Sequence, residues 1–343
     1  MDDLNFGTRD KRGHYIPNGR LELAPIWSFP PKVLKLLKWL PGYFFPWNAF
    51  LALTAVAYWH FIIPDRSVLA HLTWSWPLIL FAANAASLFV VYGFFELNMF
   101  VLKRQGTRFK YNNLFPGEQK SDVFISGNQN IDNALRTFLI SIPLWTAVEV
   151  LVLWAFANGY VPWLTFTENP WKLAIVALIV PLIHETHFYA IHRLIHTPFL
   201  YKWVHSIHHN SVNPSPWSSL SMHPLEALLY FSVGVWHLIL PSNPLIALYQ
   251  LNTAGLGAFI GHLGFDRIEV TEASAFGSHA YSHYLHHKHF EVNYADGVMP
   301  FDHIFGSYHD GTKEADERMK VRFRKKKERI AAKLAKLAKQ NAQ

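Results

Sequence analysis

Three short stretches in the second half of the chain are rich in histidine: HRLIH (192–196), HSIHH (205–209) and HYLHH (283–287). The first pairs two histidines four residues apart, and each HxxHH triplet has the spacing i, i+3 and i+4. A helical backbone turns side chains at these spacings towards one side. Together the stretches hold eight imidazoles, whereas one zinc ion takes three or four protein ligands, so the simplest interpretation is two metal ions.

Two histidines outside these stretches extend the predicted ligand set, one in MHPLE and one in GHLG. The full set of predicted metal ligands is His192, His196, His205, His208, His209, His223, His262, His283, His286 and His287. Imidazole binds iron, zinc, copper and nickel, so the ligand type alone does not choose the metal.

A ligating imidazole usually donates its second ring nitrogen to a carboxylate or a carbonyl. Glu185 lies seven and eleven residues before His192 and His196, on roughly the same side of a helix. We predict that Glu185 supports the ligands in this way, with Asp302 and Glu226 as further candidates.

The segments that must position these residues have the composition of a membrane protein. Of the 343 residues, 51% are hydrophobic and 16% are charged, against about 25% charged in soluble domains. Charge-poor runs cover 44–63, 76–102 and 137–157, each long enough to cross a bilayer. A fourth run, 173–183, must continue into the histidine segment, and 225–240 and 245–260 form either a re-entrant hairpin or two tilted spans. We therefore expect an all-α membrane bundle of about four spans plus a short hairpin, with a histidine-rich cap that binds two metals.

The distribution of Lys and Arg predicts the orientation of this bundle. The N-terminal segment, 1–43, holds seven, residues 65–73 hold one, 103–136 hold six and 158–170 hold none. The positive-inside rule then places both termini and the histidines in the cytoplasm. No dilysine retrieval signal stands near the C-terminus, which favours a bacterial inner membrane over the endoplasmic reticulum.

The same features divide the chain into three parts. An N-terminal cytoplasmic segment covers 1–43, and a membrane catalytic domain covers 44–312, with its histidines between 184 and 309. The tail, 313–343, carries 12 Lys/Arg against 4 Asp/Glu and reads as a basic amphipathic helix. Such a helix is either simply solvated or attracted to an anionic lipid surface. Because no aromatic stacking platform accompanies the charge, we expect no nucleic acid partner.

The chain has no cysteine. This excludes disulfides, thiolate zinc sites, cysteine-ligated iron–sulfur clusters and a cysteine nucleophile. Any redox chemistry must therefore take its electrons from another molecule.

The histidine pattern resembles the fatty acid hydroxylase/sterol desaturase superfamily of integral membrane di-iron enzymes. The family pattern is HxxxH, eight residues, HxxHH, a long insertion and a second HxxHH, which the three stretches match. The flanks HFYAIHRLIH, MHPLE and NYADGVMPFDHIFGS are similar as well, and the last is nearest to the sterol C-5 desaturase-like branch. Ala295 and Phe301 depart from the glycine and tryptophan that many members carry, which suggests a subgroup.

The resemblance implies two iron ions in the cap and an O₂-dependent attack on an unactivated C–H bond of a membrane lipid, either sterol-like or fatty-acyl. The outcome is hydroxylation or desaturation, and the sequence does not separate the two. The chain contains no haem-binding or ferredoxin-like segment, so the resemblance also implies an external donor, a b-type cytochrome or a ferredoxin with its reductase. No individual residue is predicted to act on the substrate directly.

Two other classes remain as alternatives. A zinc-dependent membrane hydrolase needs three ligands and a general base, which leaves at least five of the clustered histidines without a role. A metal transporter needs ligands inside several spans, whereas these histidines lie in connecting segments at one face.

Overall fold

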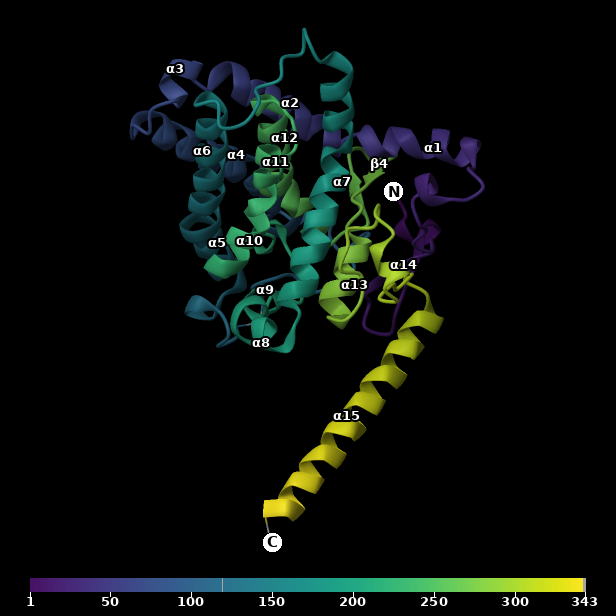
Figure 1. The fold of residues 1–343 in the computed structure, drawn as a ribbon. Coiled ribbons are helices and arrows are strands. Elements are labelled where there is room, and N and C mark those ends of the chain that lie inside the picture. The colour runs from purple at the N-terminus through teal and green to yellow at the C-terminus, as the bar shows by residue number, and fades with distance from the viewer. Residues whose placement is uncertain (119, 342–343) are drawn as a thin grey trace.

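A computed structural model describes residues 1–118 and 120–341, apart from the side chains of 336–339 and 341, and shows a mostly helical chain (Figure 1). The α-helices are α1 (Val33–Phe44), α2 (Trp47–Phe61), α3 (Arg66–Leu69), α4 (Ser75–Phe95), α5 (Gln129–Arg136), α6 (Ile142–Ala157), α7 (Pro170–Ile195), α8 (Pro198–Leu200), α9 (Ser206–His209), α10 (Pro224–Phe231), α11 (Trp236–Ile239), α12 (Pro244–Gly255), α13 (Tyr281–His289), α14 (Phe301–Ile304) and α15 (Lys313–Asn341). Two small antiparallel hairpins pair β1 (Gly7–Arg9) with β2 (Tyr15–Pro17) and β3 (Arg267–Glu269) with β4 (Ala275–Gly277).

Short 3₁₀ and π-helical turns complete the secondary structure. The 3₁₀ turns cover Asp3–Asn5, Pro25–Trp27, Ile125–Gly127, Pro216–Ser218, Ser232–Val235 and Gly257–His262, and the π turns cover Glu96–Val101, Thr137–Ser141 and Tyr201–His205. Two of the π turns join neighbouring α-helices into longer continuous rods.

Among the described residues, three continuous apolar helices are long enough to cross a membrane: Ser75–Val101, Gln129–Ala157 and Pro170–Ile195. These three helices make the chain an integral, multi-pass membrane protein. The run 44–63, expected as a further span, forms α2, whose 15 residues extend for about 22 Å at 1.5 Å per residue. That length falls short of the roughly 30 Å of hydrocarbon in a typical bilayer.

The stretch expected as a hairpin forms α10, α11 and α12, and α12 lies in the centre of the bundle. Nearly every residue of α12 is buried, and the helix packs against α2, α6 and α7. Gly255 allows this close packing, because a Cβ atom there would lie 2.7 Å from the Trp145 ring on α6. A substitution to alanine would therefore force the two helices apart.

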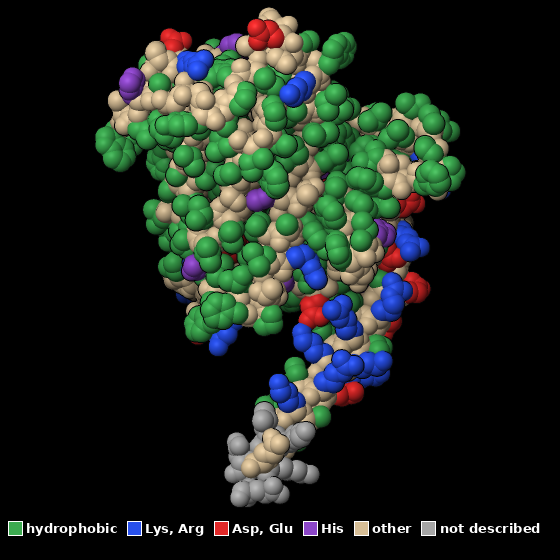
Figure 2. Space-filling model, in the orientation of Figure 1, with side chains coloured by type: hydrophobic (Ala, Val, Ile, Leu, Met, Phe, Trp, Pro, Cys, Tyr) green, Lys and Arg blue, Asp and Glu red, His purple; other side chains and the backbone are tan. Residues whose placement is uncertain are grey.

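The histidine-bearing helices gather at one end of the bundle. In Figure 1, α8, α9 and α13 lie at the lower end, opposite α3 and the loop that leads into α7. The last helix, α15, projects away from the body at the same end, and Figure 2 shows Lys and Arg side chains along it and apolar side chains over the bundle. Residues 342–343 of the predicted tail lie outside the described residues.

Candidate metal centre

The long helix α7 delivers the first two histidines to the end of the bundle. His192 lies in its last turn and is buried, and His196 caps its C-terminus. The preceding turn contributes Phe188, whose ring stacks on His192 with centroids 4.7 Å apart. A helix that spans the membrane therefore ends directly in the metal-binding region.

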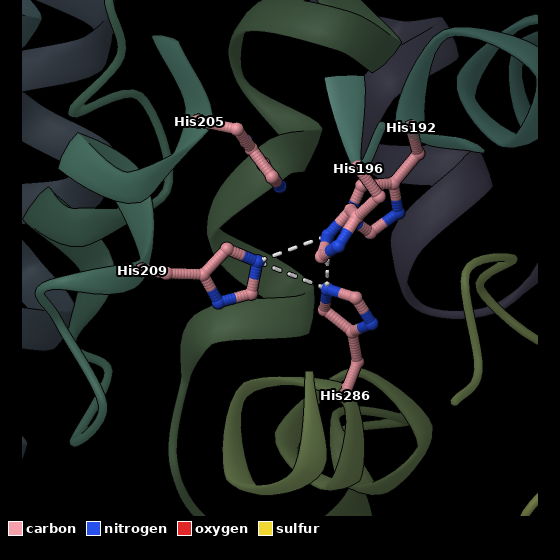
Figure 3. A group of neighbouring side chains, drawn as sticks. All are labelled: His192, His196, His205, His209 and His286. Atoms are coloured by element: carbon pink, nitrogen blue, oxygen red, sulfur yellow. Dashed lines mark hydrogen bonds between the residues drawn. The ribbon is translucent and has the colours of Figure 1, made fainter. Parts of the chain in front are cut away.

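Five histidines form a first group, which we call centre one: His192, His196, His205, His209 and His286. Figure 3 shows their rings converging from α7, the turn before α9, α9 and α13. The Nε2 atoms of His196 and His286 lie 3.1 Å apart, those of His209 and His196 3.2 Å, and those of His286 and His209 3.1 Å. Ligand atoms from all five rings lie within 4.8 Å of one another.

Four histidines form a second group beside the first, which we call centre two: His208, His262, His283 and His287. The Nε2 atom of His262 lies 3.3 Å from that of His208 and 3.2 Å from that of His283. All four side chains are buried. The centres are adjacent, since the ring centroids of His209 and His287 are only 4.8 Å apart.

These distances fit metal coordination. Metal–nitrogen bonds of about 2.0–2.1 Å at tetrahedral or octahedral angles place neighbouring ligand nitrogens roughly 2.8–3.4 Å apart. Within the described part of the chain, His205 Nε2 and His287 Nε2 are also buried without a hydrogen-bond partner. A buried polar atom without a partner is costly, and a metal ion in each group would satisfy these lone pairs.

Three rings of centre one have their other nitrogen held by an acceptor, which fixes the tautomer. His205 Nδ1 donates to Glu226 Oε1 at 2.7 Å, His192 Nδ1 to the Tyr294 carbonyl at 2.8 Å and His286 Nδ1 to the Val292 carbonyl at 2.7 Å. Each ring therefore carries its proton on Nδ1 and presents the Nε2 lone pair to the centre. This is the arrangement that metal-ligating histidines usually adopt.

Burial keeps the imidazoles in the form that binds metals. In centre two, burial lowers the pKa of His208 to about 4 and holds the pKa of His262, His283 and His287 well below the ordinary value. In centre one, burial and then neighbouring imidazoles lower the pKa of His205 and His209 in the same direction. These rings are neutral at pH 7, and the neutral ring is the ligating form.

Two of the three carboxylates predicted to support the ligands lie further from the rings. Glu185 accepts the backbone N–H groups of residues 297–299 at 2.7–3.2 Å, so it fastens that loop to α7. Asp302 accepts the N–H groups of Tyr294 and Ala295 at 3.0 and 2.8 Å. Because the Tyr294 carbonyl orients His192, Asp302 reaches a histidine only through the backbone, whereas Glu226 contacts His205 directly.

The structure brings nine of the ten predicted histidines into the two centres and leaves His223 apart. His223 caps α10 instead, and its Nδ1 accepts the Leu225 N–H at 3.1 Å. The residue directly before a proline at the first helical position is well placed for this role. The MHPLE segment still serves the site, because Glu226 projects from the first turn of the helix that His223 caps.

A further cluster, which the sequence did not reveal, joins α13 to α15. Asp316 Oδ1 lies 3.0 Å from His289 Nε2, 3.4 Å from His309 Nε2 and 3.2 Å from Lys288 Nζ. His309 Nδ1 accepts the Gly311 N–H at 3.1 Å, so its proton lies on Nε2 and points at Asp316. We therefore interpret this cluster as a hydrogen-bonded clamp. No spacing rule links these residues, since they come from three separate segments.

A cavity of about 1270 Å³ leads to both centres and is lined by residues of α1, α2, α7, α13 and the N-terminal segment. Near the histidines its walls include Phe188, Met222, Tyr230 and Ile260. An apolar pocket that ends at a polar, metal-binding group is a common form of ligand site.

Comparison with known proteins finds one matching family model and several relatives. Residues 176–307 match the model of the fatty acid hydroxylase family. The chain is similar to a Delta(7)-sterol 5(6)-desaturase of Gibberella zeae, with 28% identity over 43% of this chain and 46% of that protein. It is also similar to methylsterol monooxygenase 1 of Gallus gallus, with 30% identity over 42% and 50%, and of Rattus norvegicus, with 33% over 39% and 47%. The chain spans about half the length of these curated relatives, and no solved structure matches it.

Proposed function

Since the chain belongs to the fatty acid hydroxylase superfamily, we propose that it is an O₂-dependent oxidoreductase that hydroxylates or desaturates a membrane lipid at an unactivated C–H position. The observation that carries the proposal is the pair of adjacent, buried, all-histidine groups at the end of the large cavity. Two iron ions held there, one by the residues of centre one and one by those of centre two, would supply O₂ activation and the oxidising power for C–H cleavage.

The protein's own residues prepare this chemistry by orientation and by exclusion of water. Glu226 and the carbonyls of Val292 and Tyr294 hold three imidazoles of centre one in the ligating tautomer. The aromatic ring of Phe188 stacks on His192 and both residues line the cavity, so a hydrocarbon segment can approach the centres against an apolar wall. We propose two kinds of substrate. One is a sterol-like lipid, since the names of the relatives refer to sterols, and the other is a fatty-acyl lipid.

The reaction needs partners that this chain does not contain. O₂ reduction consumes electrons, and the chain has no cysteine and hence no cysteine-ligated cluster to store them. We propose a b-type cytochrome, or a ferredoxin with its reductase, as the external donor. The histidine end carries the basic helix α15, and we propose that this end and both termini face the cytoplasm, in keeping with the positive-inside rule. A bacterial inner membrane is the location that we favour.

The proposal is tested by metal content and turnover of the detergent-solubilised protein. We expect two iron ions per chain, loss of iron on treatment with a strong chelator, and consumption of O₂ only when electrons and a lipid substrate are both supplied. His223→Gln is the matched control, because this histidine lies outside both centres and its substitution should leave the metal content unchanged.

One zinc ion per chain after expression with abundant iron, together with hydrolysis in place of O₂ consumption, would replace the proposal with a zinc-dependent hydrolase. Two iron ions without any O₂ consumption across sterol and acyl lipids would retain the metal assignment and reject the reaction.

A further inference from the structure

The cavity that leads to the metal centres has two chemically different ends. Its inner end is formed by the histidines and by apolar side chains such as Phe188 and Ile260. Its outer part is lined by α1 and the segment before it, which contribute Lys32, Lys35 and Lys38. These lysines are three residues apart, so they follow one side of the helix.

Helix α1 and the residue before it are exposed on two sides, an apolar side and a side with three exposed lysines. Val33, Leu34 and Leu37 are 63%, 67% and 59% exposed, so the apolar side faces outward, as the green surface at the right of Figure 2 shows. The lysine side lines the cavity. An apolar outer surface is expected where a helix contacts lipid, and charged residues at membrane depth face a protein interior or a cavity.

The position of α1 supports this membrane setting. The Tyr43 hydroxyl at the end of α1 donates to the Leu178 carbonyl at 2.8 Å, and Leu178 lies well inside the apolar helix α7. Figure 1 shows α1 beside the upper part of α7, extending away from it to the right. From Leu178 to His192 the α7 axis runs for about 21 Å at 1.5 Å per residue, so the cavity accommodates an extended amphiphile between the two ends.

The outer part of the cavity has an excess of positive charge. Lys35 forms a 3.6 Å ion pair with Glu22, which also lines the cavity, and Arg20 pairs with Asp310 at 2.8 Å. Among the described residues, Lys32 and Lys38 have no ion-pair partner within 4.0 Å. The other acidic lining residues are Glu185, Glu226, Asp266 and Asp296. Glu185, midway along α7 between Leu178 and His192, is occupied by the backbone of residues 297–299. Glu226 accepts from His205, and Asp266 contacts Tyr111 and Arg267.

We propose that the cavity binds an anionic amphiphile, whose carboxylate or phosphate head group is held by Lys32, Lys35 and Lys38 while its hydrocarbon body extends along α7 to the metal centres. This inference rests on the proposed function and narrows it, because it selects a lipid with a charged head group over a neutral sterol. Charge complementarity at the outer end fixes the direction in which the lipid enters.

The test compares ligands that share one tail and differ only in the head group, with binding as the readout. Radiolabelled palmitate is compared with hexadecanol, palmitoyl lysophosphatidate with monopalmitoylglycerol, and cholesterol serves as the neutral polycyclic ligand. The variant is Lys32→Gln/Lys35→Gln/Lys38→Gln. The matched control, Lys325→Gln/Lys327→Gln/Lys333→Gln on the exposed surface of α15, removes the same charge far from the cavity.

We expect each anionic ligand to bind roughly tenfold more tightly than its neutral counterpart, a preference that three basic side chains readily supply. The cavity variant should lose this preference, the α15 variant should keep it, and Lys→Arg substitution at the three cavity positions should restore it. The palmitate and lysophosphatidate results then identify the head group as carboxylate or phosphate.

Equal affinity for the anionic and the neutral ligand of each pair overturns the inference, and so does a preference for the anionic ligand that survives in the cavity variant. Tighter binding of cholesterol than of both anionic ligands overturns it as well. If the glutamine variant does not fold, the head-group comparison and its weakening by salt in the wild-type protein decide the same question. Because binding needs no turnover, an anionic preference in a protein without iron would reject the proposed function and leave this inference standing.

Discussion

His208 and His209 are neighbours in the chain but belong to different metal centres. The Nε2 atom of His208 lies 3.3 Å from that of His262 in centre two, whereas the Nε2 atom of His209 lies 3.2 Å from that of His196 in centre one. His286 and His287 divide in the same way. Each HxxHH triplet therefore contributes histidines to both centres. Both centres thus depend on how the short helix α9 and helix α13 pack against each other.

The assignment of adjacent histidines to different centres predicts how much metal each double variant loses. His208→Gln should remove about one metal ion per chain, because centre two loses one of four ligands. His208→Gln/His287→Gln affects the same centre and should remove no more, whereas His208→Gln/His286→Gln affects both and should remove about two. Metal analysis of the purified variants by mass spectrometry measures the result. Equal losses in the two double variants would contradict the assignment of ligands to two centres.

Glu226 is expected to tune metal affinity through His205. Glu226→Gln keeps the shape of the side chain but replaces the carboxyl group that accepts the Nδ1–H hydrogen bond at 2.7 Å with an amide. Loss of such an orienting carboxylate typically lowers metal affinity by about 10–100-fold. Competition with a chromophoric chelator measures the change. Glu118→Gln, at an exposed ion pair with Lys103, is the control, and an equal effect of both substitutions would argue against the orienting role.

Lys110 should make stability depend on pH. The side chain is 0% exposed, its Nζ lies 5.0–5.5 Å from the ring centroids of Phe100, Phe115 and Phe265, and burial lowers its pKa to about 7. The unfolded chain, with an ordinary lysine pKa near 10.4, binds more protons between these values. The free energy of unfolding therefore rises with pH from about 7 to about 10.

Lys110→Met removes this dependence. The variant should gain Tm relative to the wild-type protein at pH 6, where the folded state carries the full cost of a buried charge, and the gain should shrink at pH 9. Thermal unfolding followed by tryptophan fluorescence at both pH values gives the comparison. A gain that is the same at the two pH values would show that Lys110 does not titrate in the folded protein.

The clamp at Asp316 is expected to hold the start of α15 against α13. Asp316→Asn weakens the hydrogen bonds from Lys288 and His289 and the 3.4 Å contact with His309, and charged hydrogen bonds contribute about 1.5–3 kcal/mol each. We expect tryptic cleavage of α15 to accelerate roughly tenfold while the metal content stays constant, because the clamp lies outside both centres. Glu317→Gln, at an exposed pair with Lys320, should cleave at the wild-type rate.

The sequence was informative about the ligands because helical spacing is local. The i, i+3 and i+4 pattern identified the triplets. The set was extended to His223 and His262 on their flanking residues, and the structure places only His262 in a cluster. Which of two adjacent histidines faces which centre depends on how α9 and α13 pack against α7, and no local pattern records that angle. The partition therefore became visible only in three dimensions.

Supporting contacts were harder to predict. The carbonyls of Tyr294 and Val292 orient two ligands, but every residue has a carbonyl, so sequence gives no signal for them. Glu185 was selected because it shares a helical side with His192, yet its carboxylate is used by three backbone N–H groups of a distant loop. Helical periodicity predicts only the side of the helix on which a side chain lies. Its hydrogen-bond partner depends on which other segment packs against that side.

For the membrane segments, too, the sequence predicted some elements and missed others. Apolar runs predicted α4, α6 and α7 because length and composition decide whether a helix suits a bilayer. The short α2 ends early because residues 62–65 leave the helix, and the amphipathic α1 escaped notice because its lysines interrupt the apolar run.

A predicted ligand set made only of histidines also affects which side chains are exposed to oxidative damage. The chain has no cysteine, so oxidants formed near the centres have no thiol to destroy, but the buried thioether of Met222 lines the same cavity. Thioethers convert to sulfoxides under such conditions. We expect Met222 sulfoxide, measured by peptide mass spectrometry, to accumulate when O₂ and electrons are supplied without lipid and to stay low when the cavity is filled. The amount of Met222 sulfoxide would then report how much O₂ activation is not coupled to oxidation of a lipid.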